Sequence, residues 1–472
     1  MTLKTLIPAH LFLILAHTSF GWSGDWSSFA LSLSGESDGV RARAVADLRA
    51  VPNLNEVLRK EIFGPKRALA LDVITALKLR SLLSDLLRLA PVDDTGATPL
   101  AIASLVDTHN RTQIVRIYRE LFACRGPCPF FPVYQIVALE TLERLGEVLP
   151  LTDVKSLLRS RSYEVRIAAL NYVRTFLRKK YWVYLPLVKM ALQSNPTQLR
   201  LQARYLLKEL KVQSFDRDLI KAGESPFILR ESSRALQSHD LRIAFGYKDA
   251  RPARFVGDRY ERVYLLEQLI KPCGAKSIDQ YVCGFERDLW DGDLLVKKVM
   301  GSLSQPTQLF YLRLTSASVS PDDIDNRKNP YQKIMSQSSQ DNWINGLTAA
   351  DAVYYIGHSR DGGGPDFAPP RLTQANHVDY AWYQRVRPGL TGMLSVLGKK
   401  EPQKTGHPKV LGILSCVSSK LFMKQIVEVS GETELVTTDA LLYYTDALNM
   451  TVNSLSKFIF KTLAASARRT RT

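Results

Sequence analysis

Two short apolar stretches decide the fold expected for this chain: residues 352–358 (AVYYIGH) and residues 410–416 (VLGILSC). A strand that is buried on both faces of a parallel sheet has a continuous apolar sequence of this kind. The first stretch ends in His358 and the second in Cys416. Open α/β sheets place their sites at the carboxyl ends of such strands. If the two strands are neighbours, the two side chains face each other at one edge of the sheet, as a thiol nucleophile and its base require.

The sequence around these stretches, from about residue 236 to the end, alternates between strand and helix patterns. Further strands are predicted at 281–287, 308–315 and 435–438. Helices are predicted at 338–349, 388–397, 420–429 and 451–465. Such alternation is typical of a mostly parallel sheet with helices on both faces. We therefore expect an α/β domain over residues 236–472.

The first half of the chain repeats a helical pattern. Anchor positions recur every 26 to 35 residues, at Arg41, Arg67, Leu100, Gln135, Arg166 and Arg200. An alanine follows each anchor by three residues and another apolar residue follows it by seven, which marks one face of a helix. The spacing is that of helical-hairpin solenoids, and segments such as 163–170 (YEVRIAAL) resemble HEAT repeats over about residues 35–212. We expect an all-α repeat domain over residues 22–235, with an irregular helical domain as the alternative.

The size and charge of the chain limit its partners. Its 472 residues suffice for two or three domains, and its net charge is +17. A basic balance is found in proteins that bind nucleic acids or anionic membrane surfaces, but it also serves solubility alone. No basic run is interleaved with aromatic residues, so nucleic acid is disfavoured as a partner. Helical repeats usually bind proteins. A protein partner and an anionic envelope surface therefore stay open.

The first 21 residues have the pattern of a signal peptide. Lys4 precedes an apolar segment over 6–16, and small residues for a cleavage site follow at 19–21. The alternative is a buried N-terminal helix. No other stretch reaches the length of a membrane span. The pattern predicts export of the mature protein from a bacterial cell, to the periplasm or beyond it.

Export bears on the five cysteines, because oxidising compartments allow disulfides. Cys124 and Cys128 are close in the sequence, as are Cys273 and Cys283. Pairing within each couple leaves Cys416 as a thiol, which is either a reactive group or an inert buried cysteine. No Cys/His cluster has the spacing of zinc ligands. We expect neither a metal nor an organic cofactor.

The motifs around His358 and Cys416 resemble those of the caspase-like cysteine peptidases, which include caspases, gingipains, clostripain, separase and bacterial CHAT domains. In that family an apolar strand ends in His and a small residue, and a second ends in a small residue and Cys. Here these are residues 357–359 (GHS) and 415–416 (SC), and residues 417–422 (VSSKLF) resemble the family's turn into a helix. The resemblance covers about residues 275–465 and implies a caspase-like α/β sandwich.

The same resemblance implies roles for the site residues. Cys416 would be the nucleophile, and His358 would handle the protons and protonate the leaving amine. The N–H groups of Cys416 and Ser359 would hold the oxyanion. The family usually has Gly after this His, so Ser359 leaves open an inactive relative. His358 and Cys416 are 58 positions apart, which leaves room for a crossover helix.

The loop after His358, residues 359–367 (SRDGGGPDF), contains three consecutive glycines. It is interpreted either as a substrate-lining loop or as a solvated surface loop. In the first case Asp361 or Asp366, or Asp439 after a later strand, would line a substrate pocket and favour cleavage after Arg or Lys.

Two other functions fit the sequence. Residues 357–361 (GHSRD) nearly match the nucleophile elbow of α/β-hydrolases, with Ser359 as nucleophile, but Asp361 replaces the final glycine. That triad would also need Asp379 and His407, which lie close together in the sequence. The other alternative is a secreted scaffold, in which the repeats bind a partner and the α/β domain is inactive.

Overall fold

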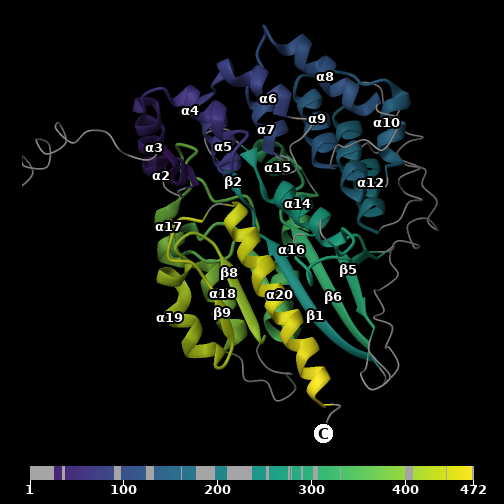
Figure 1. Ribbon diagram of the computed structural model, residues 1–472, viewed down its shortest axis with the longest axis vertical. Helices are drawn as coiled ribbons and strands as arrows, with labels where there is room; N and C mark the ends of the chain where they lie inside the picture. The colour runs from purple at the N-terminus through teal and green to yellow at the C-terminus, as the bar shows by residue number, and fades with distance from the viewer. Residues whose placement is uncertain are drawn as a thin grey trace, which may run out of the picture.

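The computed structural model describes most of the chain between residues 26 and 469 (Figure 1). The ranges are 26–34, 38–89, 97–123, 132–160, 162–176, 197–209, 236–250, 255–274, 277, 279–288, 291–300, 307–320, 322–329, 331–398, 408–442 and 444–469. The predicted signal peptide lies outside them. A helical N-terminal region is followed by a C-terminal mixed sheet of seven strands.

The N-terminal region forms helices where the repeat pattern predicts them. The helices are α2 (Trp26–Leu31), α3 (Asp38–Ala50), α4 (Leu54–Glu61), α5 (Arg67–Leu77), α6 (Leu83–Leu89), α7 (Ala97–Ser104), α8 (Arg111–Ala123), α9 (Pro132–Arg144), α10 (Leu151–Leu158), one over 163–176 and α12 (Thr197–Glu209), with 3-10 turns η1 (Ser32–Ser34) and η2 (Arg80–Leu82). All six anchors lie in these helices. Five of the six alanines that follow the anchors are buried, namely Ala44, Ala70, Ala138, Ala169 and Ala203. The 3.6-residue period therefore identified the face of each helix that enters the core.

The sheet of the C-terminal region has the order β4-β5-β6-β1-β7-β8-β9, in which the five strands from β6 to β9 are parallel. The strands are β1 (Leu236–Phe245), β4 (Glu286–Arg287), β5 (Leu294–Val299), β6 (Thr307–Ser316), β7 (Ala352–Ile356), β8 (Val410–Leu414) and β9 (Glu434–Val436). β4 and β5 add an antiparallel edge, and β2 (Asp249–Ala250) pairs with β3 (Phe255–Val256) separately. The order of the parallel strands reverses between β1 and β7, which defines a topological switch point.

The sequence placed β7 and β8 correctly, but it overestimated one strand and did not predict β1, β5 or the short pair β2 and β3. The strand predicted at 281–287 is reduced to β4, because the Asp279 carboxylate accepts the N–H groups of Tyr281 (2.7 Å) and Val282 (3.0 Å) and turns the chain. β1 was not predicted, because its first half carries polar residues. His239 is one of them, and its ring stacks on Phe310 of β6 at 5.0 Å.

Helices cover both faces of the sheet, as predicted. One face packs against α14 (Asp258–Ile270) and α20 (Tyr444–Arg469), and the other against α16 (Gln332–Ala349), α18 (Pro388–Leu397) and α19 (Ser418–Ser430). Alternate residues of β7 divide between these faces, with Tyr354 in the first core and Tyr355 in the second. The connections also contain α15 (Asp323–Lys328), α17 (Tyr380–Val386) and the 3-10 turn η4 (Arg360–Gly362). The sequence did not predict α14, α15 or α17.

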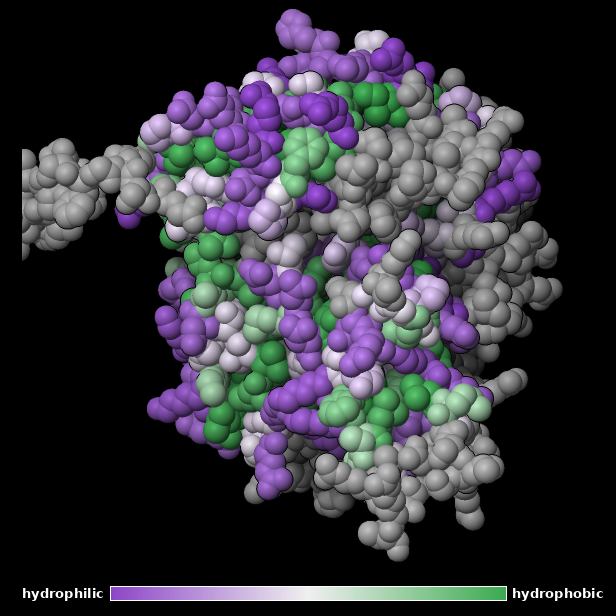
Figure 2. All heavy atoms as spheres, in the orientation of Figure 1, coloured by the Kyte–Doolittle hydropathy of each residue, from purple (hydrophilic) through white to green (hydrophobic). Residues whose placement is uncertain are grey.

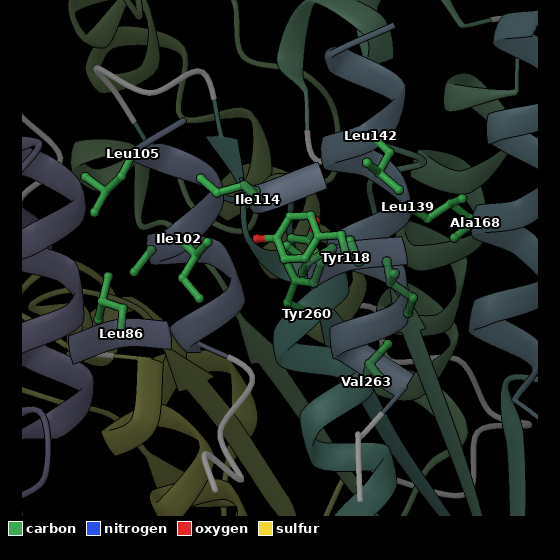
Figure 3. Close-up of a cluster of buried hydrophobic side chains, with 14 of the residues drawn as sticks. Leu86, Ile102, Leu105, Ile114, Tyr118, Leu139, Leu142, Ala168, Tyr260 and Val263 are labelled. Carbon is green, nitrogen blue, oxygen red and sulfur yellow. The ribbon is translucent and has the colours of Figure 1, made fainter. Parts of the chain in front are cut away.

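The helical region packs against the segments that follow the carboxyl ends of β1 and β6 (Figure 1). Tyr260 and Val263 of α14 belong to the same buried cluster as the N-terminal helices, beside Tyr118 and Leu139 (Figure 3). A polar Asn171–Val319 contact of 3.3 Å lies in the same interface. The two regions therefore share a hydrophobic core.

Buried ion pairs cross this interface. Arg259 contacts Glu140 at 2.6 Å, and Glu164 contacts Arg262 at 2.9 Å and Arg287 at 3.0 Å. Burial by itself would raise the pKa of Glu164, but Arg287 and Arg262 outweigh that effect and lower the pKa to about 2. The ionised carboxylate therefore stabilises the joined state of the two regions at neutral pH.

The visible surface of the helical layer is dominated by hydrophilic residues, and hydrophobic residues show as separate patches over the sheet region (Figure 2). Within the part of the chain that the structure describes, every helix is too short or too polar to cross a bilayer.

Candidate functional site

His358 and Cys416 follow neighbouring parallel strands at matching positions. Ile356 of β7 is in register with Leu414 of β8, and each of the two site residues comes two positions later. The Gly357 N–H still donates to the Leu414 carbonyl at 3.2 Å, so the strands have not diverged one residue before the site. Adjacent strands lie about 5 Å apart. The structure thus brings the two predicted residues to the same edge of the sheet.

Along each strand, alternate residues face α14 and α20, and both His358 and Cys416 continue that alternation. Cys416 belongs to that core, together with Ile356 and Leu414. The exposed fraction of Cys416 is 6% and that of His358 is 9%. Both residues are therefore largely buried, in surroundings where electrostatic interactions are stronger than in bulk water.

The turn after Cys416 is strained and leads into a helix. Val417 has φ 47° and ψ 32°, a left-handed conformation that β-branched residues rarely adopt. Helix α19 begins at Ser418, whose buried hydroxyl donates to the Ile413 carbonyl at 2.7 Å and so fixes the turn. The N-terminal end of a helix favours negative charge, and a thiolate at Cys416 would lie beside it. Backbone strain of this kind is concentrated at functional sites.

The segment 437–442, between β9 and α20, lies against the Cys416 turn. The Val417 N–H donates to the Ala440 carbonyl at 2.9 Å, and the Ser419 N–H donates to the Thr438 carbonyl at 3.0 Å. The Leu442 N–H contacts the Cys416 sulfur at 3.4 Å. This segment therefore partly shields Cys416, whose exposed fraction is 6%.

The three predicted pocket acids have different surroundings. Asp439 is exposed in the segment 437–442 and accepts a hydrogen bond from the Ser419 hydroxyl, so it lies close to the Cys416 turn. Asp361 is exposed beside Gln384. The Asp366 carboxylate contacts Arg360 and Tyr383 within the protein. Asp361 and Asp439 are therefore the two acids that face solvent.

A buried arginine organises the loop after β7. Arg360 is 1% exposed, and its guanidinium contacts the Asp366 carboxylate at 3.0 Å and donates to the Tyr247 carbonyl at 3.0 Å. The Tyr383 hydroxyl donates to the same carboxylate at 2.9 Å. A buried guanidinium needs such a counter-charge. Asp366 is therefore bound by side chains of the protein itself. The sequence suggested it as an acid of a substrate pocket.

Ser359 has an ordinary backbone conformation, with φ −79° and ψ −13°. The left-handed residues of the loop are the next two, Arg360 (φ 48°) and Asp361 (φ 51°). A glycine after His358 is therefore not required by the backbone of this chain. This removes one reason to expect that serine at position 359 disturbs the loop.

Sequence reasoning missed two tyrosines that join the loops of this edge. The Tyr355 hydroxyl donates to the His358 carbonyl at 2.8 Å. Tyr247, after β1, donates its hydroxyl to Asp323 at 2.7 Å and its N–H to the Asp366 carbonyl at 2.9 Å. The available signal was a tyrosine inside an apolar strand or at its end, where a buried hydroxyl needs a partner.

A buried carboxylate fixes the loop that follows β6. Asp258, the first residue of α14, accepts hydrogen bonds from the N–H groups of Ala317 and Ser318, both at 2.9 Å. The Ser318 hydroxyl donates to it at 2.7 Å. Burial raises the pKa of Asp258 to about 6, although these donors oppose the shift. The edge of the sheet beside the switch point is therefore held by side chains from several connections.

Cys273 and Cys283 form a disulfide, whereas Cys124 and Cys128 lie outside the described residues. Cys416 carries a thiol that is not part of a disulfide. In the described ranges, no group of three or more His, Cys, Asp or Glu side chains is placed to hold a metal ion.

Comparisons of the chain with protein-family models, with curated proteins and with solved structures find no match.

Proposed function

We propose that the protein is a cysteine endopeptidase in which Cys416 is the nucleophile and His358 is the general base and acid. The observation that carries the proposal is the register of β7 and β8, which puts the two residues at matching positions on adjacent strand ends. In the reaction, the sulfur attacks the carbonyl carbon of a peptide bond while His358 accepts the thiol proton. His358 then protonates the amine as the C–N bond breaks, and water hydrolyses the thioester.

Three features of the second half support the caspase-like assignment. A His-bearing strand precedes a Cys-bearing strand, the two are adjacent and parallel, and helices lie on both faces of the sheet. The connection between them contains α18, close to the predicted crossover helix. The turn into α19 directly follows Cys416. These features support the proposal of a caspase-like domain.

The helical region would present a substrate or a protein partner to the site. It packs on the side of the sheet toward which the parallel strands run, so a bound protein would lie near their carboxyl ends. A surface hollow of about 530 Å³ between α8 and α10 is lined by three arginines and two acids, with Thr112 and Val115: Arg111, Arg116, Arg119, Glu147 and Asp153. We propose HEAT-like repeats for this region and a protein partner as its ligand.

Export is proposed on the signal-like N-terminus, and the Cys273–Cys283 disulfide supports it. Structural disulfides persist in oxidising compartments such as the periplasm. The anionic surfaces of the cell envelope would attract a chain with a net charge of +17.

A second candidate function is an inactive scaffold, and the shielding of the thiol by the segment 437–442 favours it. In that case the helical region alone carries the function and Cys416 is an inert core residue. The α/β-hydrolase alternative has less support. Ser359 precedes a three-residue 3-10 turn, whereas Cys416 precedes a helix of 13 residues.

Covalent labelling of the native protein separates these functions. The probe is a biotinylated peptidyl acyloxymethyl ketone with arginine next to the reactive group. We expect labelling at Cys416, none in Cys416→Ala, and at least a tenfold lower rate in His358→Ala. The control His377→Ala removes an exposed histidine and should label normally. Labelling only after unfolding would support the scaffold, and loss of labelling in Ser359→Ala but not in Cys416→Ala would support the serine hydrolase.

A further inference from the structure

The hydroxyl of Tyr355 is a buried polar group for which the proposed reaction has no role so far. Tyr355 lies on β7 and is fully buried, with its ring packed between Trp343 at 5.8 Å and Phe367 at 5.4 Å. It faces the core formed with α16, α18 and α19, opposite the face to which Cys416 belongs. A phenylalanine would fill the same space, so packing alone does not explain the hydroxyl.

Two glycines leave room for this hydroxyl at the switch point. A Cβ atom on Gly246, directly after β1, would lie 2.5 Å from the Tyr355 hydroxyl. A Cβ atom on Gly357 would lie 2.4 Å from it. Real Cβ atoms do not come so close, so both glycines are needed for the hydroxyl to reach the loop after β7.

The hydrogen bonds of Tyr355 end on the backbone of that loop. A phenol has one proton to donate, and the shortest acceptor is the His358 carbonyl at 2.8 Å. The hydroxyl oxygen in turn accepts the Asp366 N–H at 3.1 Å. Tyr355 therefore fixes the direction of the His358 carbonyl and joins it to the far end of the loop.

The direction of this carbonyl decides the direction of the next N–H. The peptide unit is planar and trans, so the carbonyl of one residue and the N–H of the following residue point in opposite directions. With the His358 carbonyl held toward Tyr355, the Ser359 N–H points away from it. The Tyr355 side chain lies in the core on one face of the sheet, and Cys416 belongs to the core on the other face.

We propose that Tyr355 is a positioning residue that aims the Ser359 N–H at the oxyanion formed on attack by Cys416. The inference rests on the proposed function, since it assigns the oxyanion donor of that same reaction. The donor is a backbone group, which is why serine in place of glycine at position 359 is compatible with the role. The side chain of Tyr355 itself lies in the core on the face opposite that of Cys416.

The test compares two reactions of the same thiol in the full-length protein. In acylation by p-nitrophenyl acetate, the sulfur attacks the acetyl carbon, the bond between the acetyl carbon and the ester oxygen breaks, and p-nitrophenolate leaves with the electron pair while the base takes the thiol proton. This reaction passes through an oxyanion. In alkylation by iodoacetamide, the sulfur displaces iodide at carbon and no oxyanion forms. The burst of p-nitrophenolate is corrected with Cys416→Ala.

In Tyr355→Phe we expect acylation to slow at least about tenfold, because loss of an aimed oxyanion donor costs about 10²-fold or more and this donor is misaimed instead of removed. Alkylation should stay within about twofold. The matched control is Tyr354→Phe, which removes a buried hydroxyl of the same strand that contacts Ser454 at 2.9 Å on the other face. Both of its rates should equal those of the wild type. Replacing Tyr355 by 4-aminophenylalanine, which keeps a donor, should restore acylation.

Three results would overturn the inference. The first is an unchanged acylation rate in Tyr355→Phe. The second is an equal fall of both rates, which would mean a general disturbance of the site. The third is a wild-type protein whose Cys416 is not acylated at all, and this result alone also removes the proposed function. If Tyr355→Phe does not fold, the protein with 4-aminophenylalanine at position 355 is the test. Its ratio of acylation rate to alkylation rate must equal that of the wild type.

Discussion

Replacing Glu164 by glutamine would remove a carboxylate that contacts both Arg262 and Arg287 at the interface between the helical region and the sheet region. Its side chain is 6% exposed, so the two guanidinium groups would lose a buried counter-charge, and Arg262 would be left with its contact to Asp293 at 2.7 Å. A pKa that falls from 4.5 to about 2 on folding corresponds to about 3 kcal/mol of stabilisation by the ionised form at neutral pH.

The sign of the pH dependence follows from the direction of this shift. The folded pKa is lower than the unfolded one, so the stabilisation is fully present above about pH 4.5 and is lost as the pH falls toward 2. We therefore expect Glu164→Gln to lower the free energy of unfolding by about 3 kcal/mol near neutral pH. The difference from the wild type should shrink to less than half of that near pH 3.

Urea unfolding followed by far-ultraviolet circular dichroism measures both quantities. The matched control is Glu147→Gln, because Glu147 contacts Arg111 at 2.9 Å on the surface of the same region, where the arginine side chain is 45% exposed. Solvent screening limits the cost of that change to less than about 1 kcal/mol. Equal effects of the two substitutions, or a Glu164→Gln difference that does not vary with pH, would refute the reasoning.

Other measurements probe the frame that holds the site. Gly246→Ala would push a Cβ atom against the ring and hydroxyl of Tyr355 and should lower the free energy of unfolding by about 2 kcal/mol or more. Gly392→Ala has open space around its Cβ inside α18 and should raise the free energy of unfolding by about 1 kcal/mol. Urea titrations that rank the two variants in the opposite order would contradict this. Replacing Cys273 and Cys283 together by serine opens a loop of ten residues and should cost about 3 kcal/mol through the entropy of the unfolded chain. An unchanged melting temperature after this double replacement would show that the bridge adds nothing.

The elements that bear the site were the most predictable part of the fold. β7 and β8 are continuous apolar runs, and such runs are readable because strands buried on both faces tolerate no polar residue. The helices of the first half were readable for a similar reason, since the buried alanines repeat at a fixed offset from the anchors. β1 escaped prediction because His239 and Asp240 find partners within the sheet, and their pairing cannot be seen in a single sequence.

The surroundings of the site were less predictable than its two principal residues. His358 and Cys416 could be paired from their positions at strand ends alone. The ion pair of Arg360 with Asp366 depends on two left-handed residues in the loop, which no local pattern marked. The segment 437–442 lies against Cys416 only because β9 pairs with β8 and α20 returns across the sheet. Such contacts follow from topology, so they become visible only when the whole fold is known.

The most direct test of the Cys416–His358 proposal is a digest of a diverse peptide library, with the new termini mapped by mass spectrometry. Wild-type protein, Cys416→Ala and His358→Ala are compared at equal concentration. The proposal requires cleavage by the wild type, none by Cys416→Ala, and a rate at least 10²-fold lower in His358→Ala. Cleavage that persists in Cys416→Ala, or a wild-type protein that cuts no peptide, would contradict it.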